Sequence, residues 1–142
     1  MDLKRLLLAS VGAFAVFIIG DIVIHQVWLG EFYRTHAQWW RRGEEMQSLR
    51  GLMFVSQTLL AVLLSFIYSK GYESGKGSVG QGFRFGVLMG LLLALPSNIM
   101  NAVVYPYPPS LILSWIAGTF IEITVAGVMI GYLYKLVYRL PK

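Results

Sequence analysis

Four long apolar stretches, separated by short polar segments, occupy most of this 142-residue chain. They cover 6–30, 52–69, 83–105 and 111–134. Each is close to the length of about 20 residues with which an α-helix crosses the hydrocarbon core of a bilayer. Charged residues make up 13% of the chain, against about a quarter in soluble domains. The sequence therefore predicts an all-α polytopic membrane protein, a four-transmembrane-helix bundle that forms a single membrane domain over 1–142.

The basic residues between the apolar stretches predict the orientation of the chain, because short loops rich in Lys and Arg stay on the cytoplasmic side. Eight lie on one predicted side, namely Lys4, Arg5, Lys70, Lys76, Arg84, Lys135, Arg139 and Lys142. The other side carries Arg34, Arg41, Arg42 and Arg50. We therefore expect both termini in the cytoplasm. The segment 36–42, with Trp39 and Trp40, is expected to lie in the outer headgroup layer.

The composition excludes several classes of function. The chain has no cysteine, which rules out disulfides, thiolate catalysis and iron–sulfur ligation. The net charge of +5 comes from residues that flank apolar stretches and form no basic stripe, so we expect the lipid bilayer, and no nucleic acid, as partner. No catalytic motif is present and the residues indicate no particular cofactor. We therefore expect a non-catalytic protein.

Glycines at every fourth position predict how the helices pack. They are Gly82, Gly86 and Gly90 in the third stretch and Gly127 and Gly131 in the fourth. Small residues at this spacing let two helix backbones approach closely. The sequence therefore predicts a compact bundle with GxxxG-type packing.

A weak internal repeat relates the second and fourth stretches. When 54–73 is aligned with 120–139, the matches are Phe54/Phe120, Thr58/Thr124, Val62/Val128, Tyr68/Tyr134 and Tyr72/Tyr138. A true duplication would give two parallel helical hairpins related by an axis along the membrane normal. Shared membrane composition explains the matches equally well, and both interpretations stay open here.

Polar side chains within the apolar stretches are the candidate functional residues. A carboxylate inside a bilayer costs roughly 2.5 to 3.5 kcal/mol on insertion scales, so it usually has a partner or a role. Asp21 and His25 are four residues apart and share one helix face, while Glu122 lies near the middle of the fourth stretch. All three fall in the outer half of the predicted membrane, as do the amides of Gln57, Asn98 and Asn101. We expect a polar pocket that opens outward if these faces converge.

Three interpretations of this pocket follow from its residue types. The amides and His25 satisfy the two acids and fix the helix register, in a purely structural network. Alternatively, Asp21, His25 and Glu122 bind a polar ligand or relay protons, since two close carboxylates titrate as a unit. The third interpretation is a metal site formed by the same trio.

Glu122 is rotated by about 140° from Gly127 and about 180° from Gly131 on a regular helix. The acid and the glycine face therefore cannot contact the same neighbouring helix. Either the fourth helix is surrounded by its own chain, or one of its faces meets another subunit. The second alternative favours a homo-oligomer or a complex with other membrane protein subunits.

Residues spread over nearly the whole chain resemble a group of small, uncharacterised bacterial four-helix membrane proteins. They are Asp21 to His25, Tyr33, Trp40-Arg41, Met46, Lys70-Gly71-Tyr72-Glu73, Arg84-Phe85-Gly86, Tyr105-Pro106, Pro108, Trp115 and Glu122. The resemblance implies a four-span plan and a bacterial plasma (inner) membrane location. It implies no activity for any residue.

Two functional hypotheses follow. The first is a non-catalytic membrane component or accessory subunit that self-associates or packs in a larger membrane assembly. The second is a protein that binds or transports a small ligand, an ion or a proton, with Asp21, His25 and Glu122 at its site. The first predicts a bound partner, whereas the second predicts that Asp21→Asn or Glu122→Gln abolishes binding without unfolding the protein.

Overall fold

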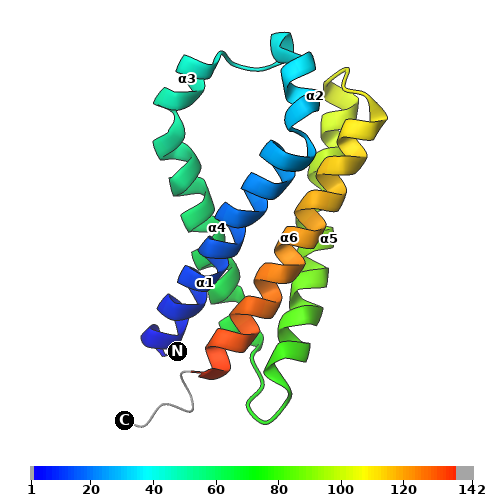
Figure 1. Ribbon diagram of the computed structural model, residues 1–142. Coiled ribbons are helices and arrows are strands. Elements are labelled where there is room, and N and C mark those ends of the chain that lie inside the picture. The colour runs from blue at the N-terminus through cyan, green and yellow to red at the C-terminus, as the bar shows by residue number, and fades with distance from the viewer. Residues whose placement is uncertain (1, 137–142) are drawn as a thin grey trace.

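The computed structural model describes residues 2–136 (Figure 1), which are helical throughout apart from short turns. Four helical segments are long and apolar enough to cross a membrane. The first joins α1 (Leu3–Asp21) to the π-helix η1 (Ile22–Trp28), and the other three are α4 (Arg50–Gly71), α5 (Ser78–Val104) and α6 (Pro109–Leu136). Three short helices link η1 to α4, namely α2 (Gly30–Thr35), η2 (Ala37–Trp39) and α3 (Gly43–Ser48).

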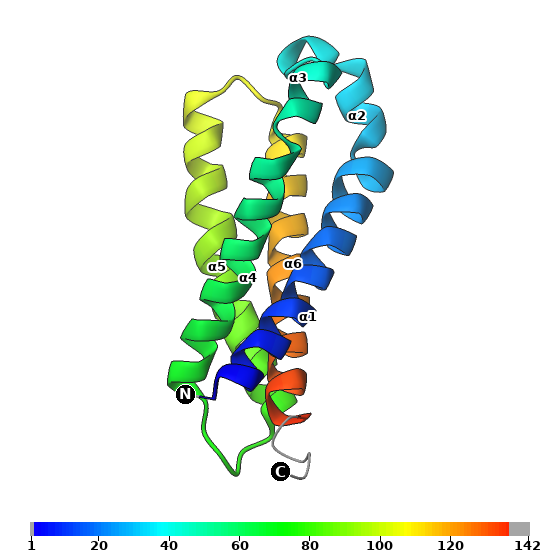
Figure 2. The same cartoon turned by 90° about the vertical axis from the view of Figure 1, so that its left-hand side faces the viewer.

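The start of α1, the turn between α4 and α5, and the end of α6 lie at one end of the bundle (Figures 1 and 2). The segment 30–48, which carries the three short helices and which we call the bridge, lies at the opposite end together with the turn between α5 and α6. We call this the bridge end. Arg139 and Lys142 of the orientation prediction, and Tyr138 of the repeat, fall outside the described residues.

The main core lies where α1, α4 and α6 meet. It is built from small and aromatic residues that are almost fully buried, including Ala9, Ala13 and Phe17 of α1 with Ala61 and Tyr68 of α4. Ala9, Ala13 and Phe17 are spaced by four residues, so they form one line on the face of α1 that packs against the neighbouring helices. This core lies away from the bridge end, at the level of the second half of α4.

Helix α6 packs against α5 on one side and against α1 on the other. Its glycine face meets α5, whereas Glu122 faces Gly20 of α1. The opposite directions of Glu122 and the glycines are therefore accounted for by two neighbours within the same chain. The sequence left two alternatives for these faces. In the structure, both the glycine face and the Glu122 face of α6 are covered by helices of the same chain.

The contact between α5 and α6 is a backbone-to-backbone seam. A Cβ atom placed on Gly86 would lie 2.7 Å from the carbonyl oxygen of Thr124, and one placed on Gly127 would lie 2.6 Å from the carbonyl oxygen of Gly82. Real Cβ atoms do not approach backbone atoms this closely. No side chain fits at these positions, and glycine is what lets the two helices approach to this distance.

The bridge packs through aromatic side chains onto the ends of η1 and α6. Ile24, Leu29 and Leu111 are buried there beneath Trp40 and Tyr107. The ring of Trp40 stacks on that of Tyr107, with centroids 5.5 Å apart. The segment that the sequence placed in the headgroup layer is thus folded onto the end of the bundle.

Candidate functional site

His25 owes its position to a change of helix type. The regular helix α1 ends at Asp21 and continues as the π-helix η1, in which the Leu29 amide donates to the Ile24 carbonyl at 2.9 Å. The wider turn leaves His25 Nε2 3.9 Å from Asp21 Oδ1, which is close enough for electrostatic attraction and too long for a hydrogen bond. Single π-helical turns occur frequently at functional sites.

The hydroxyl of Tyr33 joins His25 to α6. The indole N–H of Trp115 donates to this hydroxyl at 2.8 Å, and the hydroxyl lies 2.8 Å from His25 Nδ1. Because the indole can only donate, the hydroxyl accepts from Trp115 and is free to donate its own proton to His25. Burial raises the pKa of Tyr33, and the hydrogen bond from Trp115 opposes this shift in part. Tyr33 therefore stays neutral at physiological pH.

Asp21 has a different partner on the opposite side of α1. The side-chain amide of Gln57, in α4, donates to Asp21 Oδ2. The two residues are half-buried. This bond and the proximity of His25 connect α4, η1, α2 and α6 through one chain of polar side chains, which runs from Gln57 through Asp21, His25 and Tyr33 to Trp115.

Glu122, on α6, faces Gly20 of α1, the residue next to Asp21, and is not part of this chain of hydrogen bonds. A Cβ atom placed on Gly20 would lie 3.0 Å from Glu122 Cδ, so the missing side chain of Gly20 makes room for the carboxyl group. Glu122 Oε1 is buried and has no hydrogen-bond partner within residues 2–136. A cavity of about 210 Å³, the Glu122 cavity, is lined by Ile24, His25, Asn98, Trp115, Thr119 and Glu122.

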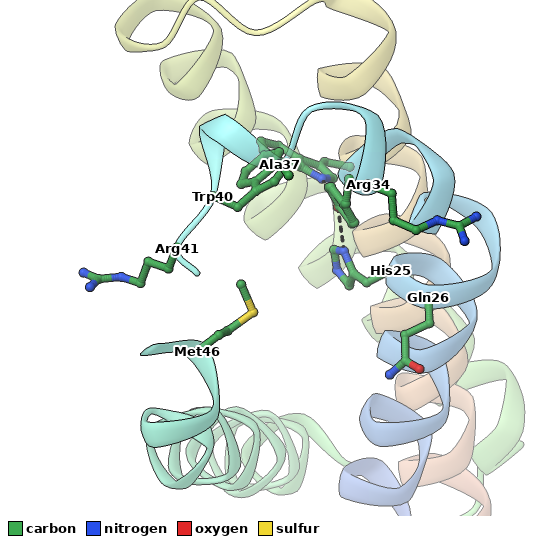
Figure 3. Close-up of a pocket in the computed structure, with 9 residues that line it drawn as sticks. His25, Gln26, Arg34, Ala37, Trp40, Arg41 and Met46 are labelled. Atoms are coloured by element: carbon green, nitrogen blue, oxygen red, sulfur yellow. Dashed lines mark hydrogen bonds between the residues drawn. The ribbon is translucent and has the colours of Figure 1, made fainter. Parts of the chain in front are cut away.

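A larger cavity of about 660 Å³, the lateral cavity, lies below the bridge (Figure 3). Its lining residues are His25, Gln26, Tyr33, Arg34, Ala37, Trp40, Arg41, Met46 and Trp115. Figure 3 shows the imidazole of His25 and the sulfur of Met46 on opposite sides of the space. His25 and Trp115 line both cavities, so the pair bonded to Tyr33 stands between them.

The six residues predicted from the sequence are therefore distributed over three places. Asp21 and Gln57 bond each other, and His25, Asn98 and Glu122 line the Glu122 cavity. The side-chain amide of Asn98 donates to the Ala94 carbonyl at 2.8 Å. Asn101 is half-buried and lines neither cavity. Within residues 2–136, no three His, Asp or Glu side chains gather closely enough to hold a metal ion, so the trio of Asp21, His25 and Glu122 is not arranged as a ligand set.

The lateral cavity was not predicted from the polar pattern of the sequence. Arg34, Trp40, Arg41 and Met46 belong to the bridge, which the sequence assigned to the membrane surface. Tyr33, Trp40, Arg41 and Met46 are far from Trp115 in the sequence, and no local pattern predicts that they meet. These separate segments come together around the lateral cavity.

The chain is therefore an all-helical protein with four helices long and apolar enough to span a membrane. A set of polar side chains lies near its bridge end. Comparison with protein-family models, with curated proteins and with solved structures finds no match.

Proposed function

We propose that this chain is an integral protein of the bacterial plasma membrane that binds a small molecule in the lateral cavity. The volume of about 660 Å³ carries the proposal, because pockets for small ligands usually measure about 300–1,000 Å³. The wall of the cavity is held by the hydrogen bonds that Tyr33 forms with His25 and Trp115. A site with side chains fixed in this way is pre-organised for binding.

The orientation completes the proposal. The end of the bundle opposite the bridge carries Lys4, Arg5, Lys70, Lys76, Arg84 and Lys135. This excess of basic residues favours the cytoplasm for that end and the outer side for the bridge. The lateral cavity then opens in the outer half of the membrane. Because the chain contains no cysteine, single cysteines placed at Ser74 and Gln47 can test this topology directly with a membrane-impermeant thiol reagent.

An assembly role remains a second proposal, in which the protein self-associates or joins a larger membrane assembly. Its main support in the sequence was the opposite direction of Glu122 and the glycine face on α6. Since α1 and α5 cover these two faces within one chain, we place ligand binding first. The two-hairpin duplication also remains a prediction.

Native mass spectrometry of the gently extracted protein tests both proposals. Ligand binding predicts a bound small molecule that is lost in Ala37→Phe, a substitution that fills the lateral cavity. The control is Ala102→Phe at an exposed position of α5, which is expected to keep the ligand. A ligand retained equally by both variants would contradict the proposed site, and masses of two or more chains would support assembly.

A further inference from the structure

The carboxyl group of Glu122 has no partner within residues 2–136. Its Oε1 atom is buried beside Gly20, and Glu122 forms no hydrogen bond or ion pair in the part of the chain that the structure describes. Glu122 lies near the middle of α6, one of the four helices able to span a membrane. An ionisable group at such a position is costly and usually has a partner or a function. Either a proton or a bound cation can neutralise it.

A second acceptor without a partner borders the Glu122 cavity. Asn98 is only 7% exposed, and its side-chain amide donates to the Ala94 carbonyl at 2.8 Å. Because a backbone carbonyl can only accept, the nitrogen of Asn98 is used and its Oδ1 atom is the free end. Within residues 2–136 this oxygen has no hydrogen-bond partner, and it is not sealed off from open space. Since Asn98 is otherwise buried and lines the Glu122 cavity, the open side of its carbonyl is this cavity.

Thr119 adds a third oxygen to the same wall. It precedes Glu122 by three residues on α6, so the two side chains lie on one helix face, and both line the cavity. Its hydroxyl forms no hydrogen bond among the described residues. The packing of α5 on α6 brings Asn98 to this face. A carboxyl group, an amide carbonyl and a hydroxyl therefore border one space, and each can accept a hydrogen bond.

The rest of the cavity is lined by Ile24, His25 and Trp115. The indole N–H of Trp115 is already bonded to Tyr33, so Trp115 contributes apolar surface, as Ile24 does. The cavity has a volume of about 210 Å³, which is far more than a bare metal ion fills. A cavity of about 150 Å³ already holds benzene. The space therefore suits a molecule of several heavy atoms with hydrogen-bond donors at one end and hydrocarbon at the other.

The charges around the Glu122 cavity favour a positive donor group. Asp21 is close enough to Glu122 to repel its charge, and Asp21 is bonded by the neutral amide of Gln57. The lining contains no Lys or Arg. His25 can accept the proton of the Tyr33 hydroxyl at Nδ1 only as a neutral imidazole. A cation in the cavity is therefore attracted by two carboxylates and repelled by no fixed positive charge in its lining.

We propose that the Glu122 cavity binds the primary ammonium group of a small amine. An ammonium group carries one positive charge and three N–H donors, which match the oxygens of Glu122, Asn98 and Thr119. The hydrogen bond to the carboxylate is charge-assisted and is the strongest of the three. The hydrocarbon part of the amine lies against Ile24 and Trp115. This site is distinct from the lateral cavity, to which the proposed function refers.

Fluorine NMR of para-fluorobenzylamine tests this proposal. The protein is held in neutral maltoside micelles, and broadening of the fluorine signal beyond that in empty micelles reports binding. The uncharged control is para-fluorobenzyl alcohol, which has nearly the same shape. We expect the amine to bind at roughly tenfold lower concentration than the alcohol. Glu122→Gln keeps the shape of the side chain and should remove this advantage, whereas Glu44→Gln, at an exposed position outside both cavities, should behave as the parent.

A second pair of variants tests the carbonyl of Asn98. Asn98→Leu has a similar volume and no acceptor, so it should weaken binding of the amine several-fold and leave binding of the alcohol nearly unchanged. Asn101→Leu is the matched control, because Asn101 is on the same helix and lines neither cavity. It should bind the amine as the parent does. Equal effects of the two Leu variants would contradict the role of Asn98.

Three results would overturn the proposal. Equal binding of amine and alcohol by the parent, or an advantage of the amine that persists in Glu122→Gln, would leave a proton as the partner of Glu122. An advantage that is lost in Ala37→Phe and kept in Glu122→Gln would place the amine in the lateral cavity. Displacement of the amine by an equal concentration of sodium chloride would assign the site to a metal ion. The proposal predicts that sodium chloride at this concentration does not displace the amine and that Ala37→Phe keeps the full advantage.

Discussion

Substitution of Gly127 by Ala tests the backbone seam that holds α5 and α6 together. The new Cβ would lie 2.6 Å from both the Gly82 carbonyl oxygen and the Gly86 Cα, whereas ordinary contact begins at 3.4 Å. The helices must therefore separate by about 0.8 Å at this point, and a gap of this size forfeits a quarter to a half of each contact energy along the seam. Both obstructing atoms belong to the backbone, so no side-chain rotation relieves the clash. We expect a loss of about 1–3 kcal/mol in the free energy of unfolding, as for other overpacked interiors.

Gly80→Ala is the matched control. Gly80 also lies in α5, but a Cβ atom there meets nothing within 4 Å. Because Ala favours a helix over Gly, this variant should be as stable as the parent or more stable by up to about 1 kcal/mol. The assay is unfolding in mixed micelles with increasing dodecyl sulfate, followed by circular dichroism. Equal stability of Gly127→Ala and Gly80→Ala would refute the close approach of the two backbones.

Three further substitutions address the polar residues. Tyr33→Phe removes the hydroxyl shared by His25 and Trp115 and should cost about 1–2 kcal/mol in the same unfolding assay. Because burial raises the pKa of Tyr33 above its ordinary value of 10.0, its neutral form stabilises the fold fully below that pH. This contribution is lost as the pH rises through the raised pKa, so above the ordinary pKa of 10.0 the parent should lose stability more steeply than Tyr33→Phe; parallel profiles would contradict this. Glu122→Gln replaces a carboxyl group whose Oε1 atom is buried without a partner within residues 2–136, and should leave the free energy of unfolding unchanged or raise it by about 1 kcal/mol, whereas a loss of several kcal/mol would indicate that the carboxyl group has a partner. Gln57→Leu removes the donor to Asp21 and should increase the mobility of a spin label at position 55, measured as a narrower spectrum; an unchanged spectrum would show that the bond does not restrain α4.

The helices could be predicted from the sequence because their cause is local. An apolar run of about 20 residues must satisfy its own backbone hydrogen bonds in lipid, and a helix does so within the run. The glycines at 82, 86, 127 and 131 could also be interpreted from the sequence. A helix face without side chains predicts that another helix packs closely against it, whichever helix that is. The structure shows which helix each face of α6 contacts. The glycines meet α5 and Glu122 faces α1, which explains why they point in opposite directions.

The site could be predicted only in part, because its remaining features depend on long-range packing. Asp21 and Glu122 were recognisable as costly charges in an apolar setting, but the sequence does not show that Asp21 bonds Gln57 or that Glu122 fits against Gly20. The π-helix at His25 has no signature in the polar pattern. The lateral cavity is lined by residues of η1, of the segment 33–46 and of α6, and no local pattern predicts that these segments meet.

The central structural claim is that α4 packs closely into the bundle only through its second half and is open in the half nearest the bridge, and a cysteine scan along α4 tests it most directly. Spin labels placed one at a time from Leu52 to Tyr68, in a chain that has no cysteine of its own, report contact with lipid through collisions with oxygen. The account predicts high accessibility over 52–59 apart from Gln57, which bonds Asp21, then a helical period of 3.6 residues over 61–68 with minima at Ala61, Leu64, Ser65 and Tyr68. A regular period that continues from 68 back to 52 would show α4 packed along its whole length and would contradict the open arrangement of its first half.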